Sequence, residues 1–184
     1  MPSADALAAR VGRALLARGV RLAIAESCTG GLVGGRVTSV PGSSRYLLGA
    51  VVAYHNSAKT ALLRVPRRTL GRFGAVSAPV AAAMARGARR VFKAGIAVAV
   101  TGIAGPGGGS AGKPVGLVYV AVCGFGRTRC RGTVFPGDRG RVRDQAADLA
   151  LNMLLEHLEE VPQGTNGCVP RAARRRRPGQ GATG

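Results

Sequence analysis

Apolar residues occur along this chain in stretches of two kinds, separated by short polar or glycine-rich segments. In the first kind, apolar residues recur every three or four positions, which is typical of a helix with one buried face. In the second kind, short runs are apolar throughout, which is typical of a strand covered on both faces. The first kind predicts helices over residues 4–19, 30–39, 57–64 and 78–93 and after Asp138, and the second predicts strands over 21–26, 46–54 and 95–100.

Two further strands are expected to pair with each other. They cover residues 115–123 and 128–135 and flank the connection Gly124-Phe125-Gly126. Because helices alternate with buried strands over the rest of the chain, the pattern predicts a layered α/β domain with a mainly parallel or mixed sheet.

Two polar residues stand where predicted helices begin. Ser77 precedes the helix over 78–93, and Asp138 precedes the last helix. The side-chain oxygen of such a residue can accept a hydrogen bond from a free N–H group of the first turn. We therefore expect both to be N-caps.

The composition changes at Pro162. The last 23 residues hold eight Pro or Gly, together with the run Arg174–Arg177. This predicts a folded domain over residues 1–161 and a disordered basic tail over 162–184. No aromatic residue interleaves the arginines to stack on bases, so we expect the tail to be solvated, with at most a weak contact to nucleic acid.

The chain of 184 residues is long enough for one domain with a real core. No apolar run approaches the roughly 18–20 residues that span a bilayer. The N-terminus has no apolar stretch ahead of a small-residue cleavage site. The expectation is a cytoplasmic protein that does not enter the membrane.

The net charge of +19 comes from 27 Lys and Arg against 8 Asp and Glu. Five of the arginines lie in the tail, and from Ser27 to Gly137 there is no acidic residue against fifteen basic ones. Such a field attracts anions, whether nucleic acid or a small phosphorylated molecule. The acid-free interval includes the candidate chemistry described next, so we favour the small phosphorylated molecule for at least part of the charge.

Cysteine and histidine spacing does not indicate a metal site. The four cysteines form no C-x-x-C pair, and the chain has only two histidines, His55 and His157. In a cytosolic chain these thiols are expected to be reduced. We therefore expect chemistry without a metal.

Two loops follow predicted strands, at the place where open α/β sheets bind ligands. The loop over 26–31 (Glu-Ser-Cys-Thr-Gly-Gly) combines a hydroxyl, a thiol and backbone N–H groups that could hold an oxyanion. The alternative is a tight turn in which Ser27 or Thr29 only caps the next helix. The loop over 101–109 is rich in glycine, which lets the backbone approach a ligand, but its spacing fits neither a P-loop nor a dinucleotide fingerprint.

A serine nucleophile requires a base, and the sequence offers no convincing Ser-His-Asp set. Tyr54 and Lys59 follow the strand over 46–54 and could reach the same cleft, where positive surroundings would lower their pKa values. The alternative for Lys59 is an ordinary surface charge. Arg139 and Arg143 lie four residues apart on one helical face and could hold a phosphate, or could be solvated.

Six motifs occur in an order that resembles the CinA C-terminal domain family, which includes nicotinamide-nucleotide amidohydrolases. The resemblance runs from about residue 5 to residue 160. The motifs are Glu26-Ser27-Cys28-Thr29-Gly30-Gly31, Tyr54-x-Asn56-x-x-Lys59, Gly74-Ala75-Val76-Ser77, Thr101-Gly102-Ile103-Ala104-Gly105-Pro106, Lys113-Pro114-Val115-Gly116 and Gly137-Asp138-Arg139.

The resemblance implies a three-layer α/β/α sandwich that converts nicotinamide mononucleotide into nicotinic acid mononucleotide and ammonia without a cofactor. It also implies a homo-oligomer. Ser27 matches the nucleophile, with Tyr54 and Lys59 in the neighbouring catalytic positions. The implied substrate-binding residues are Glu26, Cys28, Thr29, Gly30, Gly31, Thr101, Gly102, Ala104 and Gly105, with Arg139 and Arg143 at the phosphate.

In the expected mechanism Ser27 attacks the amide carbon while Lys59, hydrogen-bonded to Tyr54, takes its proton. Backbone N–H groups of residues 28–31 would hold the oxyanion. Whether Tyr54 or Lys59 accepts the proton stays open. Cys28 is a second candidate nucleophile, ranked lower because its side chain should point away from that of Ser27. The alternative from another class is a non-enzymatic nucleotide-binding or interaction module related to competence or damage response.

Overall fold

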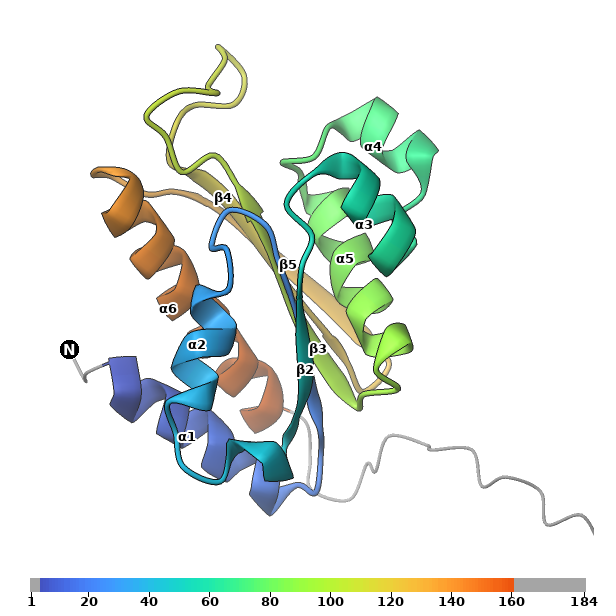
Figure 1. The fold of residues 1–184 in the computed structure, drawn as a ribbon, viewed down its shortest axis with the longest axis vertical. Helices are drawn as coiled ribbons and strands as arrows, with labels where there is room; N and C mark the ends of the chain where they lie inside the picture. Colours follow the sequence, from blue (N-terminus) through green and yellow to red (C-terminus); the bar gives the residue numbers. More distant parts are fainter. Residues whose placement is uncertain (1–3, 161–184) are drawn as a thin grey trace, which may run out of the picture.

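A five-stranded mixed sheet runs through the middle of the molecule (Figure 1). The computed structural model describes residues 4–160, so the expected boundary at 161/162 and the expected basic tail lie outside the described residues. The strand order is β2-β1-β3-β4-β5; β1 is parallel to β2 and β3, and β4 is antiparallel to β3 and β5. The strands are β1 Leu22–Glu26, β2 Leu47–Val52, β3 Ile96–Gly102, β4 Leu117–Gly124 and β5 Arg127–Val134.

Helices cover both faces of the sheet (Figure 1). On one face lie α1 Ala4–Ala17, α2 Leu32–Thr38 and α6 Arg139–Glu159; on the other lie α3 Asn56–Leu63, α4 Arg67–Phe73 and α5 Ala78–Val91. A single 3₁₀ turn, η1 Ser43–Arg45, leads into β2. The predicted α/β/α sandwich with a mixed central sheet is therefore confirmed.

The two faces of the sheet carry side chains of different size. The face toward α1, α2 and α6 presents branched residues such as Ile24, Val98 and Val120. The face toward α5 presents mostly alanines, namely Ala23, Ala25, Ala97, Ala99 and Ala121. Because alanine side chains are short, α5 lies close to the sheet, and α3 packs in turn on α5.

Contact between α3 and α5 depends on Gly87. A Cβ atom at this position would lie 2.1 Å from the carbonyl oxygen of Leu63, the last residue of α3. On the same two helices, the Arg90 guanidinium donates a hydrogen bond to that carbonyl at 3.3 Å. The glycine thus sets how closely the two helices approach.

The sequence-based expectations about helix starts are partly wrong. Asp138 caps α6 as expected, accepting a hydrogen bond from the Arg141 N–H at 2.8 Å. Ser77 occupies the N-cap position of α5 but makes no cap hydrogen bond; its hydroxyl donates to the Gly74 carbonyl instead. The helix expected to begin at residue 30 begins at Leu32.

One helix was not expected. Helix α4 forms over residues that carry few apolar side chains in sequence, Arg-Arg-Thr-Leu-Gly-Arg-Phe. Its Leu70 packs against the core between α5 and the sheet, which stabilises the turn despite its short apolar face. Among residues 4–160, no helix is both long and apolar enough to cross a membrane.

We expect Gly87→Ala to lower the free energy of unfolding by about 2–3 kcal/mol, because the new methyl group would collide with a backbone carbonyl. Urea unfolding followed by circular dichroism measures this change. The matched control is Gly71→Ala in α4, where a Cβ meets nothing within 4 Å. There the higher helix propensity of alanine should stabilise the protein by about 0.5–1 kcal/mol. Equal effects of the two substitutions would contradict the packing explanation.

Candidate active site

The three parallel strands end side by side, and the loops that follow them form the candidate site. Glu26 at the end of β1 is in register with Val52 at the end of β2 and with Val100 near the end of β3. The next residues are the turn over 27–31, the segment that leads into α3, and the glycine-rich loop over 103–116. The candidate residues therefore meet at the carboxyl edge of the sheet, as ligand sites in open α/β folds do.

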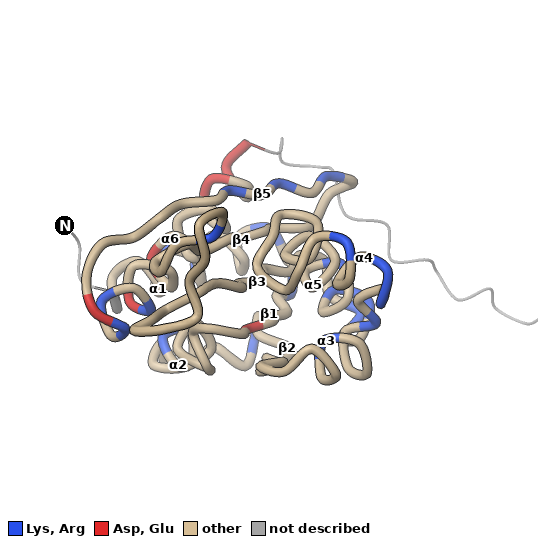
Figure 2. The backbone as a smooth tube through the Cα atoms, turned by 90° about the horizontal axis from the view of Figure 1, so that it is seen from above, with Lys and Arg blue, Asp and Glu red and all other residues tan. Residues whose placement is uncertain are grey.

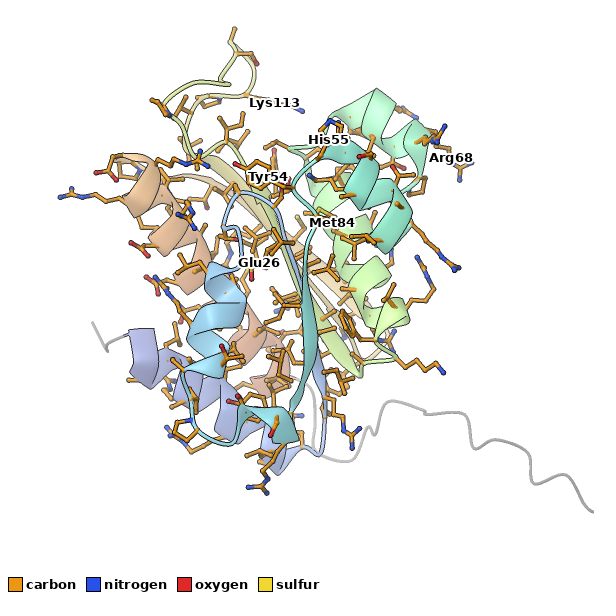
Figure 3. All side chains as sticks on the ribbon, viewed as in Figure 1. Glu26, Tyr54, His55, Arg68, Met84 and Lys113 are labelled. Carbon is orange, nitrogen blue, oxygen red and sulfur yellow. The ribbon has the colours of Figure 1, made fainter. Side chains whose placement is uncertain are left out.

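The turn after β1 is built around the Glu26 carboxylate, which points to the start of α2 (Figure 3). This side chain is fully buried. Its Oε2 atom accepts hydrogen bonds from the N–H groups of Gly31 at 2.9 Å and Val33 at 3.2 Å, and Oε1 accepts one from Gly34 at 2.8 Å. A helix N-terminus also favours a negative charge. Glu26, and not Ser27 or Thr29, thus accepts the hydrogen bonds of the first N–H groups of α2.

Ser27 and Lys59 are in direct contact. The Lys59 Nζ atom lies 3.0 Å from the Ser27 Oγ atom. It also donates hydrogen bonds to the carbonyl oxygens of Ala53 at 2.9 Å and Tyr54 at 2.8 Å. Lys59 is 1% exposed and Ser27 7%. The alternative interpretation of Lys59 as an ordinary surface charge is therefore wrong.

The surroundings of Lys59 make its amine easier to deprotonate than that of a solvated lysine. Burial lowers the pKa of its ammonium group, and the neighbouring Cys28 opposes part of that shift. A neutral amine has two N–H donors and one lone pair. As an ammonium, Nζ donates to both carbonyls and to Ser27 Oγ; as a neutral amine it can keep both carbonyl bonds and turn its lone pair to the Ser27 hydroxyl.

The backbone N–H groups of the turn are not equivalent. Gly30 donates to the Ser27 carbonyl at 3.1 Å, and Gly31 donates to Glu26. The N–H groups of Cys28 and Thr29 make no backbone–backbone hydrogen bond within residues 4–160; both lie beside the Cys28 thiol, where they oppose part of the rise in its pKa. Of the four N–H groups expected to hold an oxyanion, those of Gly30 and Gly31 are thus committed to other acceptors.

Cys28 is poorly suited to be the nucleophile. Its side chain is buried, and burial raises the pKa of the thiol to about 11. The sulfur lies against the backbone of Gly102, where a Cβ atom would come within 3.0 Å of it. Since the thiolate is the reactive form of cysteine, this thiol is inert near neutral pH.

The Tyr54 phenol does not lie on Lys59, contrary to the expectation. Lys59 contacts the backbone carbonyl of Tyr54, while the phenol oxygen accepts a hydrogen bond from Arg139 Nη2 at 2.9 Å. Tyr54 is 56% exposed. Lys59, rather than the phenol, is therefore the group placed to take a proton from Ser27.

The two arginines of α6 hold different loops. Arg143 donates from Nε and Nη2 to the Thr29 carbonyl, at 3.3 and 2.8 Å. Arg139 donates from Nη1 to the Gly105 carbonyl at 2.9 Å. Both expected phosphate ligands thus contact protein carbonyls here, and Arg139 remains exposed.

The glycine-rich loop is anchored at both ends by side chains. The Thr101 hydroxyl donates to the Ala75 carbonyl at 2.9 Å, and Ala104 is buried in the core. Lys113, labelled in Figure 3, donates to the Phe73 carbonyl at 2.6 Å. The sequence motif containing Lys113 signalled this segment, but its bond to the end of α4 was not expected. Among residues 4–160, no group of three His, Cys, Asp or Glu side chains could hold a metal ion.

The family described as "CinA C-terminal domain" matches residues 4–158. The chain belongs to this family. A CinA-like protein of Desulfotalea psychrophila is 48% identical over 84% of this chain, and one of Anaeromyxobacter dehalogenans is 54% identical over 76%. The matched segments cover only 37% and 34% of those relatives, so this chain spans about a third of their length.

Solved structures of CinA relatives have the same fold. The competence/damage inducible protein of Agrobacterium tumefaciens is 41% identical, with a TM-score of 0.83, covering 87% of this chain and 98% of that one. A CinA superfamily protein of Escherichia coli is 32% identical, with a TM-score of 0.80, covering 85% and 93%. The mixed sheet with helices on both faces is thus common to these CinA structures.

In this CinA domain we expect Glu26→Gln to lower the free energy of unfolding by about 2–3 kcal/mol. The amide would lose the charge and turn an N–H₂ group toward N–H donors. Urea titration measures the loss. The matched control is Glu159→Gln, an exposed position for which residues 4–160 contain no ion pair, where the change should be within about 0.5 kcal/mol. A similar, small loss at both positions would contradict the capping role of Glu26.

Proposed function

We propose that this CinA domain is an amidohydrolase that converts nicotinamide mononucleotide into nicotinic acid mononucleotide and ammonia. The observation that carries the proposal is the contact between Ser27 Oγ and a buried Lys59 amine whose other partners are two carbonyls. A serine with an adjacent amine base is an established arrangement for nucleophilic catalysis on acyl groups. The resemblance to a family that includes nicotinamide-nucleotide amidohydrolases supplies the substrate.

The first half-reaction forms an ester on Ser27. Lys59 takes the hydroxyl proton as Ser27 Oγ bonds to the carboxamide carbon. The carbonyl oxygen becomes an oxyanion, which the N–H groups of Cys28 and Thr29 stabilise. Lys59 then gives its proton to the amide nitrogen, the C–N bond breaks, and ammonia leaves.

The second half-reaction hydrolyses the ester. Water enters the position that ammonia has left, and Lys59 takes a proton from it as it attacks the acyl carbon. The bond to Ser27 breaks, and Lys59 returns the proton to the serine oxygen. Nicotinic acid mononucleotide is released, and the Ser27–Lys59 pair is restored.

Substrate binding uses the exposed arginine beside the catalytic pair. Arg139 is exposed and lies between the Tyr54 phenol and the glycine-rich loop, so it is the arginine placed to meet the phosphate. Arg143 holds the Thr29 carbonyl and so orients the turn that supplies the oxyanion donors. We therefore assign phosphate binding to Arg139 and positioning to Arg143.

Replacing either member of the Ser27–Lys59 pair should abolish activity. We expect Ser27→Ala and Lys59→Met each to lower kcat by at least about 10³-fold, because nucleophile or base is lost. Ammonia release from nicotinamide mononucleotide measures this, with nicotinamide riboside and free nicotinamide as substrate controls.

The matched control is Cys28→Ser, which removes the neighbouring thiol and should retain most of the activity. Full ammonia release by Ser27→Ala would exclude the proposed nucleophile. A nucleotide that binds in calorimetry without any ammonia release would instead favour the non-enzymatic binding module.

The pH dependence should follow the protonation of Lys59. Only the neutral amine can accept the Ser27 proton, and burial lowers the pKa of this group. We therefore expect kcat/KM to rise with pH through the lowered pKa and to level off above it, with its midpoint below that of an ordinary lysine. A profile that is flat between about pH 6 and pH 10, or one that falls across this range, would contradict Lys59 as the base.

A further inference from the structure

Acidic side chains are confined to one side of the molecule, whereas basic side chains occur on both. The eight acidic residues of the chain lie on α1, at the end of β1, at the cap of α6, on α6 and just after it. None lies on α3, α4 or α5. Figure 2 shows blue segments without red ones where these three helices cover the sheet.

Seven exposed basic side chains lie on this acid-free side. They are Arg64, Arg67, Arg68, Arg72, Arg86, Arg90 and Lys93, which we call the basic face. None of them is in an ion pair within residues 4–160. By contrast, Arg36 is paired with Asp144 and Asp148, and Arg131 is paired with Glu156, all on or facing the α6 side.

The fold itself uses little of this charge. Arg90 donates to the Leu63 carbonyl, and Arg72 stacks over the Phe73 ring at 5.1 Å. The other five side chains make no hydrogen bond within residues 4–160. Seven like charges without an ion-pair partner in the described part of the chain repel one another. Binding of an anion that neutralises them is therefore favourable.

The candidate active site does not account for this charge either. Its positive groups are different residues: Lys59 is buried, Arg139 and Arg143 hold carbonyls of other loops, and Lys113 is bound to the end of α4. The basic face therefore lies outside the proposed catalytic machinery.

The seven charges are distributed over several elements rather than gathered at one point. Three lie on α4 and two on the last two turns of α5, while Arg64 follows α3 and Lys93 follows α5. Arg64, Arg86 and Arg90 border a hollow of about 290 Å³. One small phosphate would contact two or three of them. A sugar-phosphate backbone carries a charge at every nucleotide and can meet several at once.

We infer that the basic face binds the sugar-phosphate backbone of a nucleic-acid duplex without reading its base sequence. Guanidinium groups donate to phosphate oxygens in pairs, and displacement of counterions from the duplex drives the association. Nucleic-acid binding is thereby assigned to the folded domain, whereas the sequence analysis expected at most a weak contact through the basic tail. It is independent of amide hydrolysis.

The test compares two variants of the full chain with the same loss of charge. The face variant replaces Arg67, Arg68, Arg72 and Arg86 by Gln; the control variant replaces Arg10, Arg13, Arg45 and Arg127 by Gln, which are exposed on other elements. A fluorescent 24-base-pair DNA duplex and an RNA duplex of the same sequence are titrated at 50 to 200 mM salt. A lysine variant at the four face positions keeps the charge, and circular dichroism verifies folding of every variant.

We expect wild type, the control variant and the lysine variant to bind with a steep salt dependence. Between 50 and 200 mM salt, the factor by which affinity falls should be about 100 times smaller for the face variant than for wild type. The reason is that about four phosphate contacts are lost. Whether wild type binds the DNA duplex, the RNA duplex or both shows which kind of duplex the basic face accepts. The inference is overturned if wild type binds neither duplex, if face and control variants behave alike, or if replacing Arg171 and Arg174–Arg177 by Gln alone removes binding.

Discussion

A buried carboxylate needs hydrogen-bond donors, and this requirement organises the candidate site. Glu26 ends an apolar strand with no access to water, and the first turn of α2 supplies three N–H groups to it. These hydrogen bonds fix the turn over residues 27–31 to the start of α2. Ser27 is left with its hydroxyl toward Lys59, and Cys28 is turned into the core.

The two helical layers contribute different parts of that site. The layer with α2 and α6 supplies the turn and, through Arg143, a second hold on its carbonyl group. The opposite layer supplies Lys59 from α3, whose distance from the sheet depends on the alanine face and on Gly87. The 3.0 Å contact between amine and hydroxyl is thus a product of packing on both sides of the sheet.

Sequence patterns predicted the architecture because most of the strands are apolar runs, which are stable only when both of their faces are covered. The same patterns did not predict α4, since Leu70 becomes an apolar anchor only once α5 is beside it. For Lys59 the sequence left burial and exposure open, because burial depends on carbonyls brought there by the end of β2. The sequence predicts Glu26 near a ligand. Its neighbours along the chain do not reveal that it accepts hydrogen bonds from three backbone N–H groups, five to eight residues later. The partners of Arg139 and Arg143 are likewise set by loops distant in sequence.

Burial of Lys59 also couples folding to proton exchange. In the unfolded chain this lysine has the ordinary pKa of 10.5, while in the folded chain its pKa is lower. At a pH between those two values the unfolded chain holds a proton that the folded chain has released, so folding liberates a proton and becomes more favourable as pH rises. Below the lowered pKa both states hold the proton, and the domain carries the full cost of a buried ammonium. The amine that the site needs in its neutral form is therefore also a group whose protonation opposes the folded state.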